Sequence, residues 1–315
     1  MSGPVRAADV DGSEEGPQDG AGSLDAIVAR EGRTAAVGGL PVRRVLPTKG
    51  RRTVGAWCFL DLMGPADAEE PDPMEVGPHP HIGLSTVTWL LEGEALHTDS
   101  LGTEQVIRPG QLNLMTAGGG IAHAELAARP PFRGAQLWIA QPDATRHGDN
   151  AFEHHDALPE VEVGQAHGSV LVGSLAGATS SARADTPLVG ADLTLRPGRT
   201  VLPLDRTFEH AVAPLDGVVK VGDEVVEPGW LALVPTGAEE LPVEARDPGA
   251  RALLLGGEPF EAKVAMWWNF VARTRDELDD AFRAWRDRDT DRFGPVPSRL
   301  EPIEAPTPPW WPAGG

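Results

Sequence analysis

The fold expected for this chain follows from a six-residue motif that occurs in both halves. Its first copy is Ile107-Arg108-Pro109-Gly110-Gln111-Leu112. In the second half, Val226-Glu227-Pro228-Gly229-Trp230-Leu231 repeats the central Pro-Gly and the apolar residues on either side. Pro-Gly suits the second and third positions of a type II turn between strands, since proline presets φ at one position and glycine supplies a positive φ at the other. The repeat predicts two related β domains in tandem.

Short strand-like runs surround both copies of this turn. The runs are mainly apolar and are bounded by Gly or Pro, as strands of small β domains are. The expected strands are Thr86–Leu91, Gln105–Ile107, Gln111–Met115, Gly134–Ala140, Ser169–Gly173, Leu193–Leu195, Lys220–Val226, Trp230–Val234 and Ala252–Leu255. Strands this short and this frequent predict an all-β protein of sandwich or barrel architecture.

One helix is expected near the end of the chain, over residues 274–288. Thr274 with Glu277 three residues later matches a capping box. Leu278, Phe282 and Trp285 then recur at helical spacing. A face this apolar predicts that the helix packs on the body of the protein.

The chain divides into four expected segments. Residues 1–22 are rich in Gly, Asp, Glu and Ser and predict a disordered N-terminal segment. The first barrel is expected over residues 23–157 and the second, with the helix, over residues 158–294, so that the join falls near the polar stretch 142–160. Residues 295–315 carry seven prolines and predict an extended tail that Trp310 and Trp311 pin to the body.

Composition narrows the classes of function. The 315 residues carry a net charge of -20, which disfavours direct binding to nucleic acid. No apolar stretch approaches the length of a membrane span, and the N-terminus shows no signal-peptide pattern, so we expect a cytoplasmic protein without a membrane partner. The single cysteine, Cys58, excludes an internal disulfide, and its apolar neighbours predict a buried side chain.

Two histidine pairs carry the candidate chemistry. His79 and His81 lie in the run 77–83, and His123 and Glu125 follow, with His123 42 residues after His81. Side chains two residues apart leave the same face of a strand, so two adjacent strands would bring all four together. Three imidazoles and one carboxylate suit a divalent transition metal with open positions, and the mixture favours Fe, Mn, Ni or Co over a structural zinc.

The other patterns fit metal binding less well. His97 is expected on a neighbouring strand, either behind the ligands or exposed, and the adjacent His154 and His155 would point to opposite faces. The second half has no comparable pair, so a metal is expected in the first barrel only. The glycines at 118–120, just before His123, either let the backbone pass close to the site or form a flexible loop. Motifs of serine hydrolases, phosphate loops and dinucleotide folds are absent from the sequence.

The ordered set of motifs resembles the pirin family of the cupin superfamily. The likeness runs through residues 79–94, 99–102, 107–110, 115–118 and 120–125, with flanking matches at 51–65, 136–138, 255–259 and 267–271. It spans about residues 26–290. The resemblance implies a bicupin fold, that is, two tandem cupin β-barrels with a C-terminal helix packing on the body.

The same resemblance implies a metal centre in the N-terminal barrel, held by three His and one Glu. By motif position these ligands are His79, His81, His123 and Glu125. The family metal is usually iron, so one Fe(II) is expected, with Ni, Mn, Co, Cu and Zn as alternatives.

The sequence departs from the family pattern at two places near this site. Ser85 and Thr86 occupy positions where many cupins carry a further Glu ligand, which Glu125 is expected to replace. Gly119 stands where many pirins have Arg, which removes a cation near the mouth of the site.

Two functions follow from the resemblance. The first is a quercetin 2,3-dioxygenase-like enzyme that takes a small aromatic substrate and O₂, with Glu125 as the general base for the substrate hydroxyl. It predicts an apolar pocket, with Phe59, Met63, Leu84 or Met115 as candidate lining. The second is a non-enzymatic iron-dependent regulator that binds a protein partner, either a metabolic enzyme or a transcription factor. A metal kept mainly for folding is a third reading. The dioxygenase is preferred, because the four-residue site looks complete and open.

Overall fold

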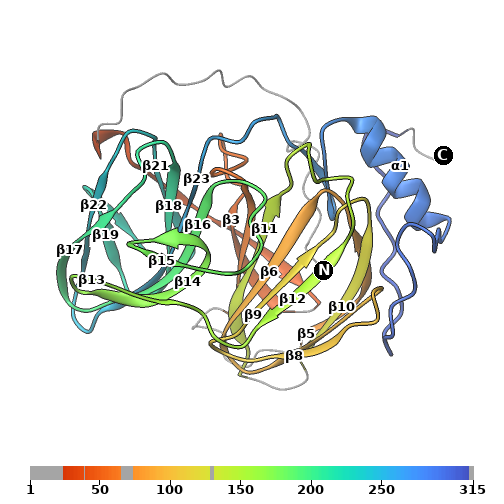
Figure 1. The fold of residues 1–315 in the computed structure, drawn as a ribbon, viewed down its shortest axis with the longest axis horizontal. Helices are drawn as coiled ribbons and strands as arrows, with labels where there is room; N and C mark the ends of the chain where they lie inside the picture. Colours follow the sequence, from red (N-terminus) through yellow and green to blue (C-terminus); the bar gives the residue numbers. More distant parts are fainter. Residues whose placement is uncertain (1–23, 39, 65–73, 128–130, 312–315) are drawn as a thin grey trace.

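The computed structural model describes residues 24–38, 40–64, 74–127 and 131–311 (Figure 1). The expected disordered segment 1–22 lies outside these residues. After a 3-10 turn, η2 (Leu24–Ala26), the described chain is built of strands and one helix. It is an all-β protein, as the sequence predicts.

Two sheets form the first barrel. Their strands are β2 (Arg33–Val37), β3 (Leu40–Leu46), β4 (Trp57–Met63), β5 (Met74–His81), β6 (Leu84–Glu92), β7 (Ala95–Asp99), β8 (Glu104–Ile107), β9 (Leu112–Thr116), β10 (Ile121–Ala127), β11 (Arg133–Ala140) and β12 (Ala151–His155). The larger sheet has the order β12-β9-β6-β11-β4-β3-β2, and the smaller has the order β5-β10-β7-β8.

The second barrel repeats this plan. Its strands are β13 (Glu160–Val163), β14 (Ala166–Leu175), β15 (Ala178–Thr179), β16 (Leu188–Leu195), β17 (Gly198–Pro203), β18 (Glu209–Asp216), β19 (Val219–Val221), β20 (Glu224–Val226), β21 (Trp230–Val234), β22 (Glu240–Ala245) and β23 (Ala250–Gly257). The smaller sheet, β17-β22-β19-β20, matches β5-β10-β7-β8 with each strand number raised by 12, and β21-β18-β23-β16 matches β9-β6-β11-β4 in the same way. The expected tandem repeat is confirmed.

The two Pro-Gly turns occupy equivalent places in this repeat, between β8 and β9 and between β20 and β21. Gly110 has φ +85° and Gly229 has φ +87°, the positive φ that a type II turn requires at its third position. The Gln111 N–H donates to the Arg108 carbonyl at 3.1 Å, and the Trp230 N–H donates to the Glu227 carbonyl at 3.0 Å. Both turns therefore have the predicted geometry.

Several strands differ from the expected ones. The run expected as one strand over 220–226 is two, because Gly222, with φ +58°, turns the chain between β19 and β20. Strand β12 lies within the polar stretch expected as the join and pairs with β9. Its residues are all half-buried, so it lacks the apolar pattern by which strands are recognised.

The larger sheets of the two barrels pack on each other, and one apolar core includes side chains of both. It joins Trp57 and Trp89 of the first barrel to Leu253 and Leu255 of the second. The Trp57 indole donates to the carbonyls of Val189 and Gly256, at 3.0 and 3.2 Å. A strand buried on both faces reads as a continuous apolar run instead of an alternating one, which explains the sequence of β4.

The ends of the chain cross between the barrels. Strand β1 (Val28–Glu31), expected in the first barrel, pairs with β21 of the second. In return, the hairpin of β24 (Ala265–Trp267) and β25 (Phe270–Ala272), expected in the second barrel, reaches the first. There Phe270 forms a parallel bridge with Ile82, and the Val271 N–H donates to the Ile82 carbonyl at 3.2 Å. Each barrel therefore contacts a segment from the other end of the chain, while the expected boundary falls between β12 and β13.

The expected helix is α1 (Arg275–Arg286), two residues shorter at its C-terminal end than the sequence predicts. Thr274 caps it, since its hydroxyl accepts the Glu277 N–H at 3.3 Å. The Glu277 carboxylate accepts the N–H of Arg273 at 2.9 Å, one residue before the position that a capping box would use. Leu278, Ala281, Phe282 and Trp285 are buried, so the helix packs on the body as expected. No helix in the described ranges is long and apolar enough to cross a membrane.

The described part of the tail, to residue 311, lies against α1 and β5 (Figure 1). The indoles of Trp310 and Trp311 both donate to the Asp279 carboxylate, at 2.9 and 2.7 Å. The Ile303 N–H donates to the carbonyl of Pro78 on β5 at 2.8 Å. Strand β5 stands at the edge of its sheet, where prolines are tolerated, and the tail covers that edge.

A buried ion pair gives a test of the first barrel. Arg44 donates to both oxygens of Asp61, at 2.7 and 2.6 Å, and both side chains are almost fully buried. Arg44→Met leaves Asp61 buried without this partner and is expected to lower the free energy of unfolding by roughly 3–5 kcal/mol. Adding Asp61→Leu removes the orphaned charge and should restore much of the loss. Urea unfolding curves of the three proteins measure this, and a double variant as unstable as Arg44→Met would contradict it.

Candidate metal centre

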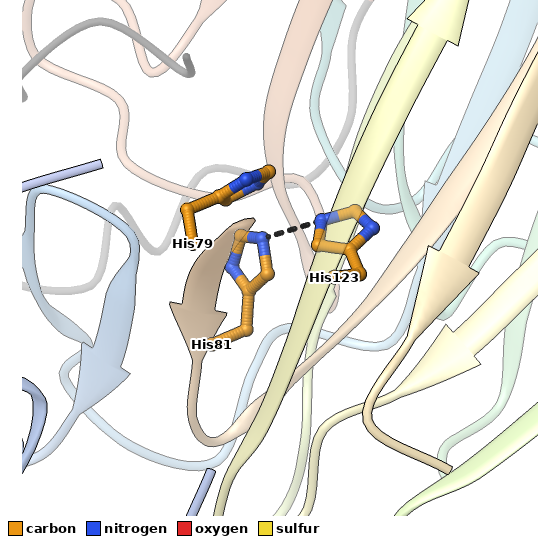
Figure 2. A group of neighbouring side chains, drawn as sticks. All are labelled: His79, His81 and His123. Carbon is orange, nitrogen blue, oxygen red and sulfur yellow. Dashed lines mark hydrogen bonds between the residues drawn. The ribbon is translucent and has the colours of Figure 1, made fainter. Parts of the chain in front are cut away.

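Three histidines meet inside the first barrel, where β5 and β10 lie side by side. The strands are antiparallel, with His123 opposite His79 and Ile121 opposite His81. The three rings face one another (Figure 2), with ring centroids 4.3 to 5.0 Å apart, and their nitrogen ligand atoms lie within 4.8 Å of each other. The strand-pairing prediction is correct for these three residues.

Glu125 lies close to this group but outside it. Between His123 and Glu125 the pairing with β5 shifts, so that Glu125 stands opposite Val76 and β5 carries one extra residue. A bulge of this kind re-aims the side chains around it. Glu125 forms an overlapping group with His97 and His123 whose ligand atoms also lie within 4.8 Å of one another. A single four-ligand set at residues 79, 81, 123 and 125 stays a prediction.

Backbone carbonyls fix the tautomers of two rings. His79 donates from Nδ1 to the Gly77 carbonyl at 2.9 Å, and His81 donates from Nδ1 to the Asn269 carbonyl at 3.0 Å. A carbonyl oxygen can only accept, so both Nδ1 atoms carry a proton, and in the neutral rings both Nε2 atoms keep a lone pair. The contact with Asn269 also ties the site to the hairpin of β24 and β25.

Burial keeps the three rings neutral. It lowers the pKa of His79 and His123 well below the ordinary value, with the neighbouring histidines adding to the effect, and it lowers the pKa of His81 to about 3. Neutral imidazole is the form that binds metals. These rings are therefore available as ligands at pH 7 without first losing a proton.

The spacing of the nitrogens fits a metal ion. His81 Nε2 and His123 Nε2 are 3.1 Å apart. Two lone pairs at this distance repel unless a proton or a cation lies between them. Two imidazole nitrogens bound to one ion at about 2.0–2.1 Å are separated by roughly 3 Å. The donor types and their separation thus suit a transition metal.

Glu125 faces a small cavity beside the histidines. Burial raises the pKa of Glu125, so its charged form is costly here and a nearby cation would stabilise it. The Thr88 hydroxyl donates to Glu125 Oε1 at 3.3 Å. The cavity has a volume of about 10 Å³, room for about one water molecule. It is lined by Val37, Asp61, Met63, Met74, Val76, His79, Glu125 and Gln136.

Only one of the four candidate pocket residues, Met63, lines this cavity. Phe59 and Leu84 pack instead in a separate cluster with Trp138. Met115 packs with Ile121. The sequence does not separate these positions, because nearly every residue of the strands concerned is buried and both faces look apolar.

The glycine run before His123 is a tight, hydrogen-bonded turn. Gly118 has φ +52°, and a side chain there would collide with the Gly148 carbonyl. Its N–H donates to the Gln141 side chain at 2.9 Å. At Gly119, the carbonyl accepts from Arg292 Nε at 3.1 Å. A guanidinium from the C-terminal segment therefore stands beside Gly119, the position at which the resemblance implies an arginine.

His97 lies on a neighbouring strand, as expected, and of the two positions left open by the sequence it takes the one behind the ligands. It lies on β7, next to β10, and is buried, with Nε2 3.0 Å from Asp99 and Nδ1 3.4 Å from His123 Nδ1. His97-Thr98-Asp99 has the same i, i+2 spacing as the two pairs chosen, and that signal could have identified it. His154 and His155 contact Asn113 and Glu153 respectively, apart from the site, as expected.

Two tandem barrels with this strand order, the first holding a histidine cluster on adjacent strands, define a bicupin. The Pirin family model matches residues 39–139, and the model described as Pirin C-terminal cupin domain matches residues 190–293. The chain belongs to the pirin family.

Similar proteins agree with this assignment. A Pseudomonas aeruginosa protein named "Putative quercetin 2,3-dioxygenase" is 45% identical over 97% of this chain and 96% of its own length. A pirin-like protein of Caulobacter vibrioides is 37% identical over 85% of this chain and 98% of its own. The crystal structure of a quercetin 2,3-dioxygenase from Acinetobacter baumannii superimposes with a TM-score of 0.84 at 44% identity, covering 90% of this chain and 96% of the other.

The histidine group gives a direct test. His123→Ala removes the residue that faces both His79 and His81, and is expected to reduce bound metal from about one ion per chain to near zero. His155→Ala, a half-buried histidine that contacts Glu153, should leave the metal content unchanged. Elemental analysis of the purified proteins after loading decides the matter. Equal metal content in the two variants would contradict the assignment.

Proposed function

We propose that this protein is a metal-dependent dioxygenase that opens the heterocycle of quercetin-type flavonols. The observation that carries the proposal is the trio of buried, neutral histidines whose ligand nitrogens lie within 4.8 Å of one another, with His81 Nε2 and His123 Nε2 3.1 Å apart. The names of the Pseudomonas and Acinetobacter relatives supply the substrate class.

In this proposal His79, His81, His123 and Glu125 hold one Fe(II). Three imidazoles and a carboxylate suit iron, nickel, manganese or cobalt, and leave positions open in a six-coordinate ion. When bound, the ion supplies Lewis acidity toward the substrate's 3-hydroxyl and neighbouring carbonyl. The fixed Nδ1–H contacts of His79 and His81 pre-orient their rings, so little reorganisation is needed for binding.

Glu125 is the proposed general base. Its carboxylate stands at the cavity where a substrate hydroxyl would enter, and a carboxylate within reach of that hydroxyl can accept its proton. Taking the 3-hydroxyl proton leaves a flavonolate. Reaction of that anion with O₂ then opens the ring and releases carbon monoxide. Val37 and Val76, the apolar part of a mixed lining, would limit contact between water and the reacting anion.

Flavonol binding requires the cavity to widen. Pockets for molecules of this size have volumes of about 300–1,000 Å³, far more than the cavity described. Met63 and Met74 form part of its wall. Methionine side chains are flexible and rearrange at low cost, so we place substrate entry on this side.

The proposal predicts flavonol loss under air. The iron-loaded protein should bleach the quercetin absorbance band with uptake of O₂, and metal removal should abolish the activity. Glu125→Gln should keep a folded protein but lower kcat by roughly 10²–10⁴, as the loss of a general base does. Glu162→Gln, the same change at an exposed position of β13, serves as the control for the loss of a carboxylate. If the iron-loaded wild-type protein leaves the quercetin absorbance band unchanged under air, the proposed function is wrong.

A second function has one observation in its favour. The His81 ring is tied through Asn269 to the hairpin of β24 and β25, which packs with α1 and the tail. A change in metal charge could alter this C-terminal surface and report the iron state to a protein partner.

Under this second function, binding of a protein from a cell extract to the immobilised chain should differ between the Fe(II), Fe(III) and metal-free forms. Removing the His81 ligand with His81→Ala should abolish the difference while leaving metal-independent binding in place. Capture that is the same for all three forms would exclude an iron-sensing role.

A further inference from the structure

We propose that Asp99 and His97 form a hydrogen-bond relay that positions His123 as a metal ligand. The inference rests on the metal site of the proposed function, but it concerns residues outside the expected ligand set. His97 and Asp99 are positioning residues here, acting through His123.

The relay follows from the pairing of two adjacent strands and from two side-chain contacts, one within β7 and one from β7 to β10. Strand β7 lies beside β10, with Asp99 opposite His123. His97 Nε2 is 3.0 Å from Asp99 Oδ2, and His97 Nδ1 is 3.4 Å from His123 Nδ1. His97, Asp99 and His123 are each at most 3% exposed, so water does not compete for these contacts.

The direction of the hydrogen bonds is set by the carboxylate. A carboxylate accepts, so His97 donates from Nε2 to Asp99, and in the neutral ring Nδ1 is left as an acceptor. His123 then donates from Nδ1 to His97, and its own lone pair is on Nε2. That atom is the one that faces His81 Nε2 at 3.1 Å. The relay thus gives His123 the tautomer that backbone carbonyls impose on His79 and His81.

Each member of the relay is itself held in place. Asp99 Oδ1 accepts the N–H groups of Leu101 and Thr103, at 2.9 and 3.0 Å, so the carboxylate is anchored to its own turn. The His97 ring stacks on Phe152 of β12, with centroids 4.5 Å apart and an interplanar angle of 26°. A ring fixed in both plane and tautomer can orient its neighbour.

The competing role for His97 is that of a ligand, since its donor atom lies within 4.8 Å of those of His123 and Glu125. For an ion in that group, the His123 nitrogen on the His97 side is Nδ1. The same ring cannot offer Nδ1 to one ion and also keep the proton there that leaves Nε2 free for the three-histidine group. The relay leaves lone pairs on both His81 Nε2 and His123 Nε2, 3.1 Å apart, which is the arrangement that an ion bound between them would require.

Asp99→Asn is the decisive variant, because it changes hydrogen-bond direction without changing size. The new amide can still accept the turn N–H groups through oxygen, but its NH₂ group then faces His97. His97 must reverse its tautomer, and its Nδ1 then carries a proton directed at His123. Outer hydrogen-bond partners of this kind typically change metal affinity by about 10–100-fold, and we expect Asp99→Asn to weaken binding by that factor.

The matched control is Asp156→Asn. His154 and Asp156 have the same i, i+2 spacing and the same 3.0 Å contact from Nε2 to carboxylate, but they lie outside both candidate metal groups. The Asp156→Asn variant should bind the metal ion with the affinity of the wild type. His97→Gln should restore most of the affinity lost in His97→Leu, since glutamine offers one acceptor to His123 and one donor to Asp99.

The measurement is competition for Co(II) between a chelator of known affinity and the full-length chain, with circular dichroism to verify folding. The relay predicts weaker binding in Asp99→Asn and His97→Leu, one ion per chain at saturation, and visible cobalt bands like those of the wild type. Should Asp99→Asn fail to fold, the His97→Leu and His97→Gln pair gives the same comparison.

Two results would overturn the relay alone. Folded Asp99→Asn or His97→Leu protein that binds Co(II) as tightly as the wild type would show that the contacts have no effect. Changed cobalt bands in His97→Gln would show that His97 is itself a ligand. Wild-type protein that binds no ion would remove the relay and the proposed function together. Metal binding that follows the relay pattern without flavonol turnover would remove the dioxygenase alone.

Discussion

The pairing of β5 with β10 is the constraint on which the candidate site depends. It sets His123 opposite His79 and brings His81 within 3.1 Å of it, across strands that are distant in sequence. Each ring is buried, and burial disfavours its protonated form. Since charged imidazoles this close would repel strongly, the same packing that assembles the cluster also keeps it neutral and able to bind a cation.

The two barrels show how one scaffold supports different interiors. Strands β17 and β22 occupy the places of β5 and β10 in the strand order of the repeat. Where the first barrel has histidines on these strands, the second has buried Leu202, Leu241 and Val243, which belong to a continuous apolar core. The strand order therefore specifies the barrel, while the residues at a few inward positions specify whether it can hold a polar site.

Much of this could be predicted from the sequence, for reasons that are local. A type II turn needs only Pro109 and Gly110, and a two-residue spacing on a strand needs only the pleat, so the tandem barrels and the trio of histidines followed from short patterns. The bulge between His123 and Glu125 could not be predicted, because it depends on how β5 pairs with β10. The exchange of β1 and of the hairpin β24–β25 between barrels likewise depends on tertiary packing. Local sequence patterns do not show which barrel these segments join.

The packing around the site indicates whether a bound metal would serve folding or function. A site needed mainly for folding should stand where the core is otherwise thin. Here the first barrel has its own apolar cluster around Leu40, Leu90 and Phe132, and it shares a larger one with the second barrel. The rings of His79 and His81 are held by backbone carbonyls that exist whether or not an ion is bound. Buried polar groups so placed lower stability relative to apolar ones, and folds retain them where they serve function. The placement of these groups favours a metal centre with a chemical or sensing role over a metal kept mainly for folding.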